Sequence, residues 1–186
     1  MKVKTMLFSV GATVSLAVLA TGAAISAQDK YTVKVPNGLA FSEFKGYEGW
    51  RTISVSHNGP HLALILGNAA MIEAYQAGIP GNGKPFPDGA KMAKVHWNIK
   101  KNEAQPGQPL QPSSQSDVDF MVKDSKRFAD SAGWGYGAFK YDTATDTFTP
   151  ATTADQPPQG NDAKCGFGCH TIVKDHDYVF TEYAHR

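Results

Sequence analysis

Two cysteines and one histidine near the C-terminus have the types and spacing for covalent attachment of a cofactor. Cys165 and Cys169 are the only cysteines of the chain, and His170 follows the second directly. A cysteine pair followed by histidine is typical of c-type haem, because the thiols add to the porphyrin vinyl groups and the imidazole ligates the iron. Three residues separate these cysteines, one more than in the usual C-x-x-C-H motif.

A disulfide between Cys165 and Cys169 is the alternative interpretation of this pair. Such a bond is compatible with a turn and with an oxidising compartment, but it leaves His170 unexplained. Gly166 and Gly168 also favour haem, because residues without a Cβ let the backbone arch between two fixed attachment points. The segment therefore predicts one covalent haem c per chain, with iron ligated by the histidine.

The sixth coordination position of the iron has no ligand candidate with a telling spacing. The other histidines and the methionines of the mature chain are scattered, and isolated residues of these types mostly serve in cores or on surfaces. We therefore expect a five-coordinate iron with one open face, which suits small-molecule binding or redox chemistry.

The N-terminus has the pattern of a secretory signal peptide over residues 1–27. Lys2 and Lys4 precede a short apolar run, and the segment ends with small residues at Ala27. A retained membrane anchor is the alternative, but the run is short and small residues follow it at once. Cleavage leaves residues 28–186 as a single exported domain in the periplasm, an oxidising compartment.

The charge balance bears on the class of partner. The formal net charge of the chain is +1, and no basic patch is visible. This argues against nucleic acid as a partner.

The hydrophobic pattern predicts an α+β fold, with an antiparallel β-sheet and flanking helices. A helix capped by Asn68 is expected to run through Gln76, and short helices over 41–47 and 124–130. Residues 102–116 and 143–161 are expected to be connections. Exposed strand edges allow a homodimer. The predicted strands are 31–35, 50–57, 62–66, 90–101, 118–122 and 133–141.

Several motifs outside the haem segment are shared with a known family. They are Tyr47 with Trp50, the turn Asp88-Gly89-Ala90 that leads to Lys94, VKDSKRFAD at 122–130 and DYVFTEY at 177–183. Together with the C-terminal haem segment, they make the chain resemble the cytochrome P-460 family, which includes the beta-sheet cytochromes c′. The resemblance covers most of the mature sequence. It implies an antiparallel sheet with flanking helices and a C-terminal haem.

The resemblance implies one of two activities. In P-460 members proper, a lysine amine is also bonded to the porphyrin edge, and the haem oxidises hydroxylamine with an external redox partner. In the c′-beta members that link is absent, and the haem binds gases such as nitric oxide.

Lys94 falls where the cross-linking lysine of the family would lie. On a strand it shares one face with Met92 and His96, whereas Ala93 and Val95 share the other. Lys94 meets the porphyrin if the haem covers its face, and is a solvated surface lysine otherwise.

The resemblance also gives an expectation for the open side of the haem. The strand HLALILG offers Leu62, Leu64 and Leu66, where some hydroxylamine-oxidising relatives place a polar side chain. His61 is the nearest polar candidate. An apolar pocket suits a neutral diatomic gas, whereas an oxidation that releases protons benefits from a base. Asp177 and Glu182, after the haem histidine, are candidates for pocket carboxylates, although surface charges are the favoured interpretation.

Overall fold

The computed structural model describes residues 28–35, 38–151 and 166–184. The predicted signal peptide and Cys165 lie outside these residues. Within them, no helix is both long and apolar enough to cross a membrane.

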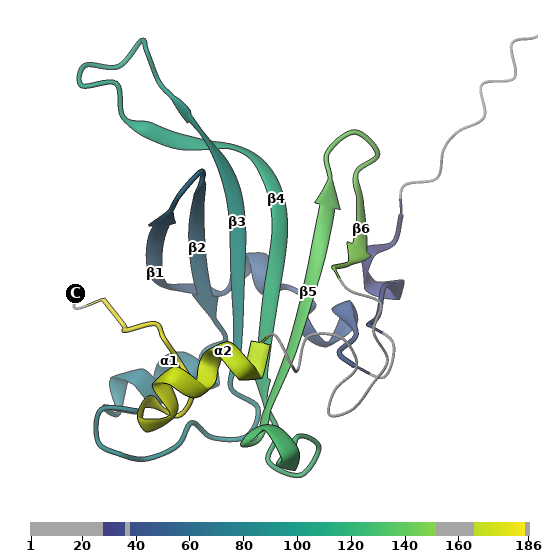
Figure 1. Cartoon of the computed structure of the whole chain (residues 1–186), viewed down its shortest axis with the longest axis vertical. Helices are drawn as coiled ribbons and strands as arrows, with labels where there is room; N and C mark the ends of the chain where they lie inside the picture. Colours follow the sequence, from purple (N-terminus) through teal and green to yellow (C-terminus); the bar gives the residue numbers. More distant parts are fainter. Residues whose placement is uncertain (1–27, 36–37, 152–165, 185–186) are drawn as a thin grey trace, which may run out of the picture.

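A single six-stranded antiparallel sheet forms the body of the protein, with the strands side by side in chain order (Figure 1). This arrangement confirms the predicted α+β fold. The strands are β1 (Arg51–Asn58), β2 (His61–Gly67), β3 (Lys91–Lys101), β4 (Leu110–Lys123), β5 (Trp134–Asp142) and β6 (Thr147–Pro150). Every strand pairs with the next one along the chain, and the connections range from a short turn to the longer segment between β2 and β3, which contains a helix.

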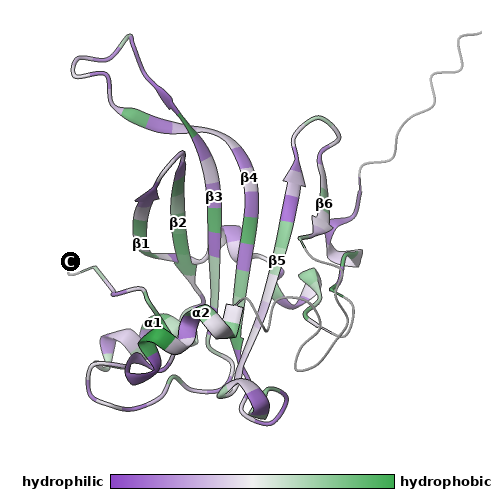
Figure 2. Ribbon diagram, viewed as in Figure 1, coloured by the Kyte–Doolittle hydropathy of each residue, from purple (hydrophilic) through white to green (hydrophobic). Residues whose placement is uncertain are grey.

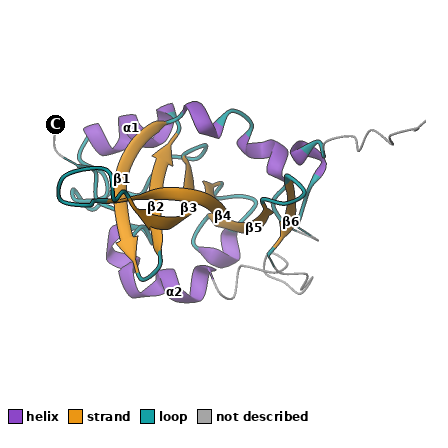
Figure 3. Cartoon of the chain, turned by 90° about the horizontal axis from the view of Figure 1, so that it is seen from above, coloured by secondary structure: helices purple, strands orange, loops and turns teal. Residues whose placement is uncertain are grey.

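The helical segments are short and lie on both sides of the sheet (Figure 3). Helix α1 (Ala69–Gln76) has the predicted bounds, because the Asn68 side chain accepts a hydrogen bond from the Met71 N–H at the first turn. The others are α2 (Gly168–His170) and the 3₁₀ helices η1 (Lys30–Thr32), η2 (Phe41–Phe44), η3 (Tyr47–Gly49), η4 (Ala129–Ser131) and η6 (Thr171–His176).

Strand β4 begins earlier than predicted. Residues 102–116 were expected to be a connection, but β4 starts at Leu110 and extends the hairpin with β3 well beyond the rest of the sheet (Figure 1). Pro112 stands opposite Ile99 next to a register shift. A proline cannot donate to the ladder, so it is tolerated where the pairing is irregular.

Three other predicted segments also differ. The interval 143–161 contains strand β6, which closes a hairpin with β5. Residues 31–35 are not a regular strand: the segment begins in η1 and makes only an isolated bridge from Lys34 to Ala40. The predicted helix over 124–130 is a turn followed by η4.

The sheet separates two hydrophobic cores, because successive side chains of a strand point to opposite faces and β3 and β4 carry apolar residues on both faces (Figure 2). On one face, aromatic side chains of the N-terminal 3₁₀ helices pack on the strands, among them Phe44 stacked on Phe120 at 4.1 Å between ring centroids. On the other face, α1 and the C-terminal segment cover one end of the sheet, with Met71, Met92 and Val179 buried between them. The rest of this second face forms the cavity described next.

Candidate haem site

A cavity of about 620 Å³ lies between the second face of the sheet and the C-terminal segment. Its volume is within the range of about 300–1,000 Å³ that is usual for small-molecule and cofactor sites. The wall combines apolar, hydroxyl and charged side chains. Those from the strands are Ser54, Ser56, Ile65, Met92, Lys94, Asp119, Met121 and Tyr136, and those from the C-terminal segment are His170, Val179, Phe180, Thr181 and Glu182.

His170 lines this cavity from the end of α2. Its Nδ1–H donates a hydrogen bond to the backbone carbonyl of Tyr178. In the neutral imidazole this leaves Nε2 without a proton, which is the form that ligates a metal. The ring packs against two aromatic side chains, with its centroid 5.1 Å from that of Tyr136 and 4.8 Å from that of Phe180. The imidazole is therefore held in one tautomer and one orientation.

The electrostatic surroundings also favour the neutral form of His170. Burial lowers the pKa of its imidazole below the usual 6.5. The hydrogen bond to Tyr178 acts in the opposite direction, the positive charge of Lys94 lowers the pKa and the negative charge of Asp119 raises it. Both charges on the sheet are thus close enough to the histidine to influence it.

The cysteine segment contacts the sheet through Gly166. A Cβ on Gly166 would lie 2.7 Å from Cγ of Tyr136, closer than real Cβ atoms approach a neighbour, so the side chain of Tyr136 fills the space that another residue would need. At Gly168, by contrast, no other atom lies within 4 Å of the place that a Cβ would occupy. Cys169 is exposed on α2 and is not among the described side chains that line the cavity. Cys165 lies outside the described residues.

Lys94 lies on the cavity face of β3. Lys94 and Met92 line the cavity, whereas Ala93 and Val95 are buried in the first core on the other face of the sheet. Of the two orientations that the sequence left open, the structure has the one in which Lys94 and His170 share a single cavity.

The prediction that Leu62, Leu64 and Leu66 form an apolar wall of the haem pocket is wrong. Leu66 is buried in the first core and Leu64 packs against it, on the face opposite to the cavity. Leu62 shares their face by alternation. Among the described residues that line the cavity, Ile65 is the only one from β2, so the strand turns the face opposite to the leucines toward the cavity.

A row of cross-strand neighbours makes the central wall polar. Ser54 pairs with Ile65, which pairs with Lys94, which in turn pairs with Asp119. Side chains directly opposite each other on adjacent strands have Cβ atoms about 4.5–5.5 Å apart. Lys94 and Asp119 are therefore immediate neighbours on the cavity wall.

Asp119 also contacts a histidine from the neighbouring strand. His96 Nε2 lies 2.9 Å from Asp119 Oδ2 and 3.8 Å from Asp117 Oδ1. Burial raises the pKa of Asp117 above its usual 3.8, although the nearby His96 acts in the opposite direction. The His61 ring lies 6.4 Å from that of His96, so His61 belongs to this cluster and is not part of the described cavity lining.

The two carboxylates after the haem histidine have different positions. Glu182 is exposed and lines the cavity. Asp177 is not a surface charge as expected: its side chain is only 12% exposed and forms an ion pair with Lys123.

Asp119, Ser54 and Ser56 were not among the candidates from the sequence. The sequence does contain a pattern that points to Asp119. Asp117 and Asp119 alternate with Val118 and Phe120, and apolar residues follow them in the strand. Two carboxylates on one face of a central strand mark a face that does not pack into a dry core.

A comparison with models of protein families gives a match to Cytochrome P460 over residues 44–181. The chain belongs to the cytochrome P460 family. The matched range contains all six strands, Lys94 and the segment around His170. Membership identifies the protein as a haem-binding cytochrome. A search of curated protein sequences gave no match.

The residues of the cavity fit a haem. The volume is that of a cofactor site, the histidine is held with Nε2 available, and the wall has apolar side chains in Ile65, Met121 and Val179. The contact of Gly166 with Tyr136 brings the cysteine segment against the same wall.

Proposed function

We propose that this protein is an exported periplasmic cytochrome that oxidises hydroxylamine or a related small nitrogen compound. One covalent haem c would be held by Cys165 and Cys169, with His170 as a ligand of the iron. The observation that carries the proposal is the pairing of Lys94 with Asp119 on the cavity wall that His170 also lines.

Lys94 is the residue that would hold the porphyrin edge. The family resemblance supplies the expectation of a lysine link, and the position of Lys94 in the cavity supports it. Asp119 lies directly opposite Lys94 on the neighbouring strand and would hold the lysine side chain at the cavity wall.

Asp119 is also the best-placed base for substrate oxidation. When bound, the haem c supplies an iron centre for the nitrogen compound and takes up its electrons, which pass to an external redox partner protein. The protons released must be accepted in the cavity, and Asp119 offers a carboxylate oriented by His96 at 2.9 Å. A positioned general base contributes about 10²–10⁴-fold to a rate.

Binding of nitric oxide without turnover is the second candidate function. Ile65, Met92, Met121 and Val179 make part of the wall apolar, which suits a neutral diatomic gas. In this alternative Lys94 would remain unmodified.

Mass analysis of the exported protein separates these proposals. The chain is produced with haem-maturation machinery, and its intact mass and peptide map are measured together with the visible spectrum of the reduced protein. The enzyme proposal requires haem on both cysteines, a modified Lys94 peptide and hydroxylamine-dependent reduction of an added electron acceptor. An unmodified Lys94 with an ordinary haem c spectrum and no turnover would support gas binding instead. A mass without porphyrin would refute both.

A further inference from the structure

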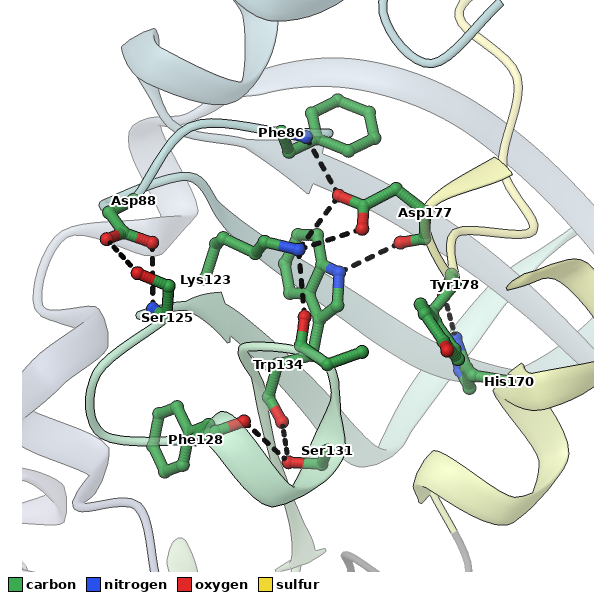
Figure 4. A network of polar contacts seen from close by, with 11 residues as sticks. Phe86, Asp88, Lys123, Ser125, Phe128, Ser131, Trp134, His170, Asp177 and Tyr178 are labelled. Carbon is green, nitrogen blue, oxygen red and sulfur yellow. Dashed lines mark hydrogen bonds and ion pairs between the residues drawn. The ribbon is translucent and has the colours of Figure 1, made fainter. Parts of the chain in front are cut away.

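A buried ion pair connects the motif VKDSKRFAD to the C-terminal segment. Lys123, at the end of β4, is only 6% exposed. Its Nζ lies 2.8 Å from Asp177 Oδ1 and 3.0 Å from Oδ2, and it donates a further hydrogen bond of 3.0 Å to the carbonyl of Ala132. Figure 4 shows these contacts. A charge is buried at a high cost in desolvation, so such a pair is stable only when its hydrogen bonds are satisfied.

Asp177 is held by two further segments of the protein. Its Oδ2 accepts a hydrogen bond of 2.8 Å from the Phe86 N–H, and its backbone carbonyl accepts one of 2.8 Å from the indole N–H of Trp134 (Figure 4). The Lys123 ammonium also lies 4.9 Å from the centroid of the Trp134 ring. Strands β4 and β5 and the loop before β3 therefore all fix this one residue.

The backbone at Asp177 and the next residue has an unusual conformation. Asp177 has φ 48° and Tyr178 has φ 62°, both in the left-handed region that residues with a Cβ rarely adopt. Strained conformations of this kind persist only where the surroundings determine them. At Asp177 the surroundings are the ion pair and the hydrogen bonds described above.

This turn carries the group that orients the histidine. The carbonyl of Tyr178 accepts the hydrogen bond from His170 Nδ1–H (Figure 4). Asp177 is thus anchored to the sheet on one side, and its immediate neighbour holds the imidazole on the other.

We propose that Lys123 and Asp177 are a positioning pair, which sets the orientation and the basicity of the imidazole of His170 by fixing the carbonyl of Tyr178. The inference rests on the proposed role of His170 as axial ligand. A hydrogen bond from the second ring nitrogen fixes a metal-ligating histidine and makes it a stronger donor. Because Lys123 pairs with Asp177, no unpaired charge is left at the residue before the Tyr178 carbonyl that accepts from His170.

Resonance Raman spectroscopy of the reduced haem protein tests this proposal through the iron–imidazole stretching band. The variants are Lys123→Met, Asp177→Asn and the double variant, in which no charge is left unpaired. We expect the band to broaden and shift to lower frequency in all three. The control is Arg127→Gln in the same motif, which removes an exposed ion pair with Glu43 and should leave the band unchanged.

The outcomes separate positioning from other roles. Opposite shifts in the two single variants with recovery in the double variant would mean a purely electrostatic effect and overturn the proposal. So would a lower urea midpoint with an unchanged band, which indicates a structural role only. Asp177→Asn keeps the size of the side chain and an oxygen that can accept the hydrogen bond from the Phe86 N–H. If Lys123→Met does not fold, the band of Asp177→Asn alone tests the positioning role. A protein mass without porphyrin would refute the proposed function as well, whereas a haem-loaded protein with an unchanged band refutes only the positioning pair.

Discussion

Asp119 Oδ2 lies 2.9 Å from His96 Nε2, and of these two side chains only Asp119 lines the cavity. His96 comes from β3 and Asp119 from β4, so the contact depends on the register between the strands. The histidine fixes the orientation of the carboxylate, which lies opposite Lys94 on the wall of the cavity that His170 also lines. This arrangement gives the polar wall a base of defined geometry.

Asp119→Asn should therefore reduce hydroxylamine oxidation. The amide keeps the size of the carboxylate but cannot accept a proton, so we expect a loss of kcat of about 100-fold or more. The matched control is Asp117→Asn, on the same face of the same strand but outside the described cavity lining. Turnover is measured by reduction of an added electron acceptor under saturating hydroxylamine. Equal losses in the two variants would show that Asp119 is not the base.

Gly166→Ala should destabilise the protein and impair the fit of the cysteine segment. The new Cβ would meet Tyr136 at 2.7 Å, which forces the segment or the ring to move. Overpacking of this kind costs about 1–3 kcal/mol. Gly168→Ala is the control, since nothing lies within 4 Å of its Cβ position. The free energy of unfolding in urea and the haem content per chain are compared; similar values for the two variants would contradict the importance of the Tyr136 contact.

The stability of the protein should respond to pH in opposite ways at two aspartates. Burial raises the pKa of Asp117 above 3.8, so its contribution to stability is complete below pH 3.8 and is lost as the pH rises through the pKa of the folded protein. Hydrogen bonds from the Ser125 hydroxyl and N–H lower the pKa of Asp88, so its contribution is present above pH 3.8 and is lost as the pH falls through its folded pKa.

The opposite pKa shifts of the two aspartates predict opposite effects when each carboxyl is replaced by an amide. Relative to the unsubstituted protein, Asp117→Asn should gain stability as the pH rises above 3.8, whereas Asp88→Asn should lose stability as the pH rises toward 3.8 from below. Urea midpoints at several pH values provide the measurement. If both variants changed in the same direction with pH, the difference in environment between the two carboxyls would be disproved.

Lys94→Leu should convert the visible spectrum of the reduced protein to that of an ordinary haem c and abolish hydroxylamine oxidation. The substitution removes the only group proposed to bond the porphyrin edge, while the cysteine links remain. Lys91→Leu is the control, because the Lys91 ammonium donates a hydrogen bond of 2.6 Å to the Glu43 carbonyl, on the N-terminal side of the sheet. A spectrum that does not change in Lys94→Leu would show that the lysine is not linked.

Local sequence patterns were sufficient for most of the elements. Asn68 caps α1 through its own side chain, and alternation defined β1, β2, β3 and β5 within a few residues. These features depend on neighbours in the chain. The pattern failed where a long-range partner supplied the pairing: β4 continues through Pro112 because β3 lies beside it, and β6 forms only because β5 is available.

The cavity wall could be predicted only in part for a related reason. Alternation shows that Lys94 and Val95 point to opposite faces, but it does not say which face carries the cofactor. For β2 the expected face was wrong, since Leu64 and Leu66 join the aromatic core and Ile65 faces the cavity. Apolarity alone did not distinguish the core from the cavity, because both faces of a central strand are covered.

Residue types and their spacing along the chain are enough to identify the chemistry available to this protein: a cysteine pair followed by His170, a lysine at position 94 and the motifs that mark the family. The folded chain was needed to show that Lys94, Asp119 and His170 meet around one cavity and that Asp177 is bound by Lys123. Strand register and long-range hydrogen bonds bring these groups together, and neither is encoded in any single segment.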